Sequence, residues 1–200
     1  MSTATIVIGP EHHGRTMSLE DFADAEGREG HLYELGRGVI TVIDVPNRPH
    51  LRQLIAIREQ IHGYQASNPG IVNSVCGGGE CKVPVVGTDS ERHPDIAVYK
   101  THPPQIDDSQ LWSVWIPELV IEVVSPGSDD RDYHQKPEEY LQFGVQEYWI
   151  VDESKDAMTV HQRSSGQWDT RTVSPGKKYK THLLPGFEFD LQRVFDAVRS

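Results

Sequence analysis

The feature that most constrains this chain is the run "ELVIEVV" at 118–124, where apolar residues occupy both alternating faces. Such runs are typical of a central strand that is covered on both sides by other elements. One carboxylate, Glu122, interrupts the run, and an ionised carboxylate buried without a partner costs several kcal/mol. The run therefore predicts a layered sheet and a partner for Glu122, either a bound cation or a buried arginine such as Arg92 or Arg131.

The other patterns predict a mixed α/β chain. Helical spacing of apolar residues predicts a long helix over 48–64 and a second over 129–143, which ends at Gly144. Two further short helices are expected, one after the N-cap Ser18 and one over 191–199. Strands are expected over 31–35, 38–45, 70–75, 82–86, 95–99, 118–124, 147–152, 157–163 and 167–173, with hairpin turns at 36–38 and 164–166. We expect one α/β (or α+β) domain over 1–200, with a mixed central β-sheet flanked by helices.

The net charge limits the partners that we expect for this chain, and the N-terminal stretch limits its location. The chain carries a net charge of −11, so it lacks the overall basic footprint of most nucleic-acid binders, and any such contact needs a local patch, a cation or an oligomer groove. The stretch "MSTATIVIGP" has no basic region and no long apolar run. We therefore expect no signal peptide, no membrane segment and a cytoplasmic location.

Three charged residues could act together. Asp95 opens the strand pattern in "HPDIAVYK", Glu122 interrupts the next strong strand, and Lys136 follows on the helix after it. Two converging carboxylates repel each other, and a hard divalent cation such as Mg²⁺ removes that problem. A nearby lysine can then stabilise charge on a phosphate. The alternatives are a turn role for Asp95 and a solvated helix position for Lys136, which is spaced to pair with Asp132.

Several blocks of the sequence resemble one known family. These blocks are "RHPDIAVY", "PELVIEVVSPGSDDRDYHQKPEEYLQFGVQEYWIVD" and "LLPGFEFDL", and the likeness extends over about residues 18–195. They are similar to the Uma2 family, also called DUF820, whose members are described as restriction endonucleases. The resemblance implies the restriction-endonuclease-like fold and its PD-(D/E)xK active site.

Carried over by position, the resemblance assigns roles to single residues. Asp95 and Glu122 fill the two acidic positions and would bind the metal, together with the backbone carbonyl of Val123. The expected "xK" falls at Val123–Val124, so Lys136, which matches a lysine of the family pattern, takes the lysine role. Pro137 follows it directly, where the family continues its helix with an ordinary residue, and predicts a helix start or a kink there.

Two further positions match the family. Glu34, in "LYEL", matches a glutamate of the first strand and is either an additional metal ligand or part of a strand-end ion pair. His50 starts the long helix, where the family often has a histidine that either approaches the site or pairs locally.

The resemblance implies a divalent-metal-dependent endonuclease, using Mg²⁺ or Mn²⁺, that hydrolyses phosphodiester bonds in DNA as a homodimer. The alternative is a catalytically inactive, nuclease-like binding or regulatory module. A third possibility is a small metal site formed by Cys76, Cys81 and His93. The spacing "CGGGEC" instead favours two cysteines that flank a hairpin tip, because a zinc site needs about four ligands.

Overall fold

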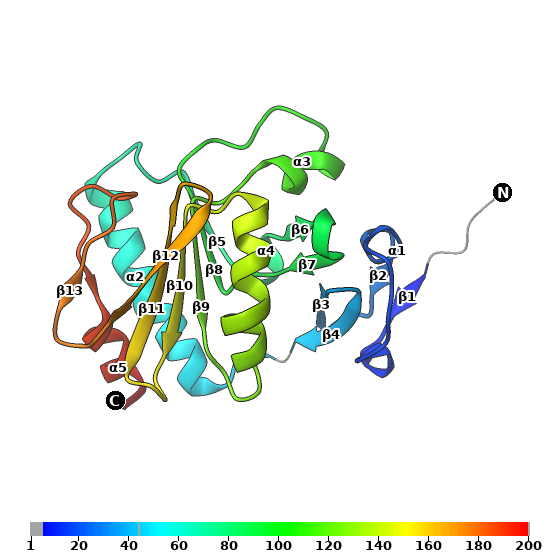
Figure 1. Cartoon of the computed structure of the whole chain (residues 1–200), viewed down its shortest axis with the longest axis horizontal. Coiled ribbons are helices and arrows are strands. Elements are labelled where there is room, and N and C mark those ends of the chain that lie inside the picture. Colours follow the sequence, from blue (N-terminus) through cyan, green and yellow to red (C-terminus); the bar gives the residue numbers. More distant parts are fainter. Residues whose placement is uncertain (1–5, 44, 200) are drawn as a thin grey trace.

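The computed structural model describes residues 6–43 and 45–199. The first half of the N-terminal stretch and Asp44 of the strand predicted over 38–45 lie outside the described residues. The centre of the molecule is a six-stranded sheet in which only β9 and β10 are parallel (Figure 1). In spatial order its strands are β12 (Gln167–Val173), β11 (Ala157–Ser164), β10 (Glu147–Asp152), β9 (Leu119–Val123), β8 (Ile96–Tyr99) and β5 (Ser74–Cys76).

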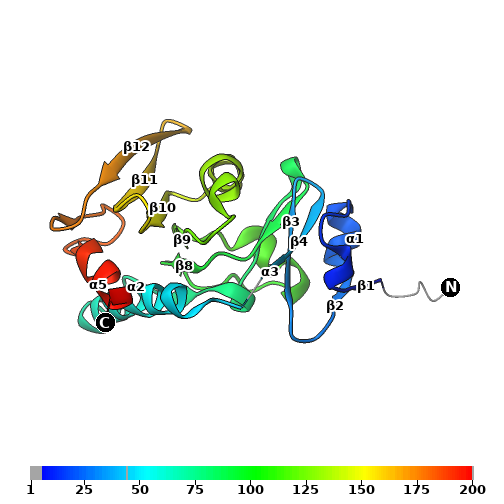
Figure 2. The same cartoon turned by 90° about the horizontal axis from the view of Figure 1, so that it is seen from below.

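Strand β9 is the buried central strand that the apolar run predicts. Its alternate residues Leu119, Ile121 and Val123 pack in the core beneath α2 (Arg48–Ser67) and α5 (Leu191–Arg199). Val120 faces the opposite way and packs with Tyr140 of α4 (Lys136–Phe143). Figure 2 shows α2 and α4 on opposite sides of β8 and β9. The predicted mixed α/β fold with a central sheet between helices is confirmed.

A second, antiparallel sheet lies between the central sheet and the N-terminal segment (Figure 1). Its strands are β4 (Val39–Ile43), β3 (Leu32–Gly36), β7 (Ser90–Arg92) and β6 (Val83–Val85), of which β7 has no counterpart among the predicted strands. The remaining elements are β1 (Val7–Ile8), β2 (Glu26–Gly27), α1 (Leu19–Ala23), α3 (Asp108–Val114), β13 (Lys178–Tyr179), β14 (Phe189–Asp190) and short 3₁₀ turns at Pro10–His12, Gly78–Glu80 and Val86–Thr88.

Two predicted hairpins are confirmed, and each turn has two successive residues with positive φ. These are Arg37 (51°) and Gly38 (75°) between β3 and β4, and Ser165 (50°) and Gly166 (79°) between β11 and β12. Positive φ at both central positions is the requirement of a type I′ turn, whose twist matches that of the strands.

The hairpin predicted at "CGGGEC" is wrong. Strand β5 before it pairs with β8 in the central sheet, whereas β6 after it pairs with β7 in the second sheet. The glycines allow the chain to change direction, but the strands on either side join different sheets. No helix in the described part of the chain has the length and apolar content needed to cross a membrane.

Candidate active site

Glu122 lies on the face of β9 that is covered by α4, because it shares the alternation of Val120. Its side chain is 3% exposed. The Tyr140 hydroxyl donates to Glu122 Oε1 over 2.6 Å, and Lys136 Nζ lies 3.0 Å from the same oxygen. The buried-arginine alternative is therefore wrong, since the cation beside Glu122 is a lysine.

Asp95 lies directly before β8, beside the end of the antiparallel strand β9. The Val123 backbone N–H donates to Asp95 Oδ2 over 2.8 Å, and the Asp95 N–H donates to Glu122 Oε2 over 3.4 Å. His50 Nε2, from the first turn of α2, lies 3.3 Å from Asp95 Oδ2. The fold thus makes Asp95 and Glu122 neighbours and adds His50 to them, so His50 approaches the site.

The helix expected over 129–143 forms, and it contains one turn of π-helix (Arg131–Gln135) immediately before α4. Pro137 has no N–H to donate, and its ring conflicts with the carbonyl of an ordinary preceding α-turn. A π-turn widens the backbone at that point, which lets the helical path continue without that clash. Lys136 is consequently buried and points inward, with Nζ 2.8 Å from Asp132 Oδ1 and 3.0 Å from Glu122 Oε1.

Burial and mutual repulsion set the protonation of this cluster. Burial raises the pKa of Glu122 to about 8; Lys136 opposes the shift, and the charge of Asp95 adds to it. Burial also opposes charge on Lys136, but the carboxylates of Asp132, Glu122 and Glu34 outweigh it and raise the lysine pKa. Lys136 is therefore held as a cation.

Glu34 lies on β3, and its charge acts on Lys136. Its Oε2 is 3.3 Å from Arg92 Nη1, and its Oε1 accepts the His93 backbone N–H over 2.9 Å. Burial alone would raise the pKa of Glu34, but the charges of Lys136 and Arg92 outweigh it and lower the pKa. Both oxygens are engaged by protein groups, which matches the ion-pair alternative for this residue.

The adjacent ends of β8 and β9 thus bring two carboxylates to a lysine of α4. A family model described as "Uma2: Putative restriction endonuclease" matches residues 19–192. This chain belongs to the Uma2 family. The family resemblance of the sequence is confirmed.

A solved structure supports the same fold for this Uma2 protein. It is titled as a putative nuclease belonging to DUF820 from Anabaena variabilis ATCC 29413 and matches with a TM-score of 0.72. The two sequences are 17% identical, and the match covers 91% of this chain and 99% of that chain. A search of curated proteins finds no match.

The donor atoms of the Uma2 site suit a hard divalent cation. In residues 6–43 and 45–199, no group of three His, Cys, Asp or Glu side chains is placed to hold a metal ion. Mg²⁺ does not need one, because it keeps several waters and is bound by one or two carboxylates. Asp95 is 22% exposed, and Oε2 of the buried Glu122 accepts the Asp95 backbone N–H. The Val123 carbonyl points to the same strand edge as its N–H, toward Asp95.

The two cysteines do not form part of this site. His93 Nδ1 lies 2.9 Å from the carbonyl oxygen of Cys81 rather than from a thiol. Burial raises the pKa of the Cys81 thiol to about 12, and the thiolate is the form that binds metals. Cys76 and Cys81 are both free cysteines.

Sequence reasoning missed Tyr140 as a member of the cluster. Asp132, Lys136 and Tyr140 are spaced four residues apart, which places them along one face of a helix. Ser128 extends the network, because its hydroxyl donates to Asp132 Oδ2 over 2.5 Å. The spacing was visible in the sequence, but nothing in it showed that this face meets Glu122.

Proposed function

We propose that this Uma2 protein is a divalent-metal-dependent endonuclease of the PD-(D/E)xK type that cuts DNA. The observation that carries the proposal is the buried contact of Lys136 Nζ with Glu122 Oε1 at 3.0 Å, beside Asp95. Glu122 and Lys136 are expensive to bury, and a phosphodiester-cleaving site gives a use to both of them and to Asp95 beside them.

Each side chain has a distinct task in this proposal. Asp95 and Glu122, with the Val123 carbonyl, would hold Mg²⁺ or Mn²⁺, and such an ion lowers the pKa of a bound water and offsets charge on a phosphate. Lys136 donates hydrogen bonds that orient the attacking water and stabilise negative charge developing on the phosphate. Asp132 and Tyr140 position Lys136 and Glu122 through the contacts described above.

The test is cleavage of supercoiled plasmid with Mg²⁺ or Mn²⁺ by the wild type, Glu122→Gln and Lys136→Met. Loss of one electrostatic or acid–base group typically slows such a reaction by about 10²–10⁴-fold. Glu138→Gln is the matched control, because Glu138 lies on the same helix but pairs with Arg37 at the surface. Cleavage by Glu122→Gln at the wild-type rate would refute the proposal.

The same experiment distinguishes the nuclease proposal from its alternative, a catalytically inactive binding or regulatory module. The net charge of −11 favours that alternative, since an acidic protein repels DNA. A wild type that leaves plasmid uncut in either metal would support it. The cytoplasmic location and the homodimer remain predictions, and light scattering of the purified protein tests the dimer.

A further inference from the structure

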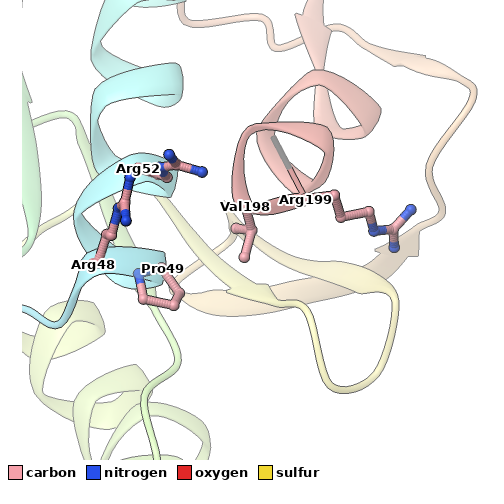
Figure 3. Close-up of a pocket in the computed structure, with 5 residues that line it drawn as sticks. All are labelled: Arg48, Pro49, Arg52, Val198 and Arg199. Atoms are coloured by element: carbon pink, nitrogen blue, oxygen red, sulfur yellow. The ribbon is translucent and has the colours of Figure 1, made fainter.

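A hollow of about 290 Å³ lies between the start of α2 and the end of α5. Arg48, Pro49 and Arg52 line it from α2, and Val198 and Arg199 line it from α5. Figure 3 shows Arg48 and Arg52 side by side, one helical turn apart, across from Val198. Like charges at this spacing destabilise a helix, so the pair is not explained by the stability of α2.

The two arginines that α2 contributes to this hollow lack the carboxylate partners that neighbouring arginines have, whereas Arg199 lies 3.8 Å from Asp196. In the described part of the chain, Arg52 Nη1 donates to the Ala197 carbonyl at 3.4 Å, and no carboxylate contacts Arg48 or Arg52. On the same two helices, Arg58 pairs with Glu80 and Arg193 pairs with Glu59. A chain with a net charge of −11 has many acidic residues, yet among residues 6–43 and 45–199 none of them pairs with the guanidinium group of Arg48 or Arg52.

The hollow and the candidate active site both use side chains from the first turns of α2. His50, between the two arginines in sequence, contacts Asp95. Residues two apart project from roughly opposite sides of a helix, so Arg48 and Arg52 lie on the side of α2 that faces away from Asp95, and the helix itself, about 10 Å wide, separates them from it. The positive end of the α2 dipole adds to the attraction for an anion.

We infer that Arg48 and Arg52 bind the phosphodiester backbone of the DNA substrate on the outer side of α2, away from the bond that is cut. Guanidinium groups bind phosphate oxygens through paired hydrogen bonds, and Arg199 extends the basic surface. This inference rests on the proposed function, because it names how the same site holds its substrate. It also explains how an acidic protein binds DNA through one local patch.

The experiment is fluorescence anisotropy of a short labelled DNA duplex with the full chain, in Ca²⁺ so that DNA is not cut. Each lost phosphate contact reduces the salt slope by about 0.9, so Arg48→Gln/Arg52→Gln lowers it by about 1.8. At roughly 0.1 M salt this equals about an 8-fold weaker Kd per arginine and about 60-fold for both. Arg193→Gln, on the adjacent helix, is the matched control and leaves Kd unchanged.

The outcomes separate this inference from the nuclease proposal. An unchanged Kd and salt slope in the double variant, with its melting temperature preserved, overturns the arginine site even if the wild type cuts plasmid. A wild type that shows no DNA binding also overturns it. Weakened binding in the double variant supports the site, and it does so even if no plasmid is cut and the nuclease proposal fails.

Discussion

Arg92 is the buried cation that joins the second sheet to the helix carrying Lys136. Its side chain is 0% exposed. Its Nε and Nη2 donate to the two oxygens of Glu139 on α4 over 2.7 and 3.0 Å. Its Nη1 donates to Glu34 over 3.3 Å, and its Nη2 also donates to Gln135 over 3.1 Å. We expect Arg92→Met to destabilise the fold strongly, because it leaves two buried carboxylates without this cation.

The size of the effect follows from these contacts. Removing one partner of a buried ion pair costs about 3–5 kcal/mol, compared with a total unfolding free energy of about 5–15 kcal/mol for a typical domain. Urea unfolding followed by tryptophan fluorescence measures the change, since Trp149 is fully buried in the core. The matched control is Glu138→Gln, which removes a surface ion pair with Arg37 and should change stability by about 0.5 kcal/mol or less.

A double variant and the pH dependence of stability each check that the loss in Arg92→Met comes from its ion pairs. Arg92→Met/Glu139→Gln removes both charges, so the stability lost in the double variant should be smaller than the sum of the losses in the two single variants by about 1.5–3 kcal/mol.

Lys136 and Arg92 lower the pKa of Glu34 in the folded state below its ordinary value of 4.5. The ion pair of Glu34 therefore stabilises the fold above pH 4.5, and this stabilisation is lost as the pH falls through the folded-state pKa. The Arg92→Met deficit should therefore shrink in acid. A single-variant loss under about 1 kcal/mol, or strictly additive losses, would refute the reasoning.

Two further predictions concern the cysteines and the hydroxyl beside Glu122. Burial raises the pKa of the Cys81 thiol to about 12, so alkylation of the native protein at pH 8 should modify the half-buried Cys76 first. Cys81 should react only after denaturation. Mass spectrometry that finds equal rates of modification for the two cysteines would contradict this. Tyr140→Phe removes the 2.6 Å hydrogen bond to Glu122 Oε1. It should lower the free energy of unfolding by about 1.5–3 kcal/mol in urea titrations, and an unchanged midpoint would show that the bond contributes nothing.

Local patterns in the sequence were enough to predict most elements of this Uma2 chain. The apolar run at 118–124 predicted a central strand, and helical spacing predicted α2 and the helix that ends at Gly144. The turn residues predicted both hairpins that form. These predictions succeed because backbone periodicity and turn geometry depend on neighbouring residues along the chain.

The tertiary structure decided which charges meet. The sequence allowed either Arg92 or a metal ion beside Glu122, but the order of strands and helices places Arg92 in contact with Glu139 and Glu34 instead. The π-turn before Pro137 directed Lys136 inward to Glu122, 14 residues earlier in the chain. The strands beside "CGGGEC" joined different sheets although their local pattern resembled a hairpin. Such contacts depend on which elements become neighbours when the layers pack, and no local pattern encodes that choice.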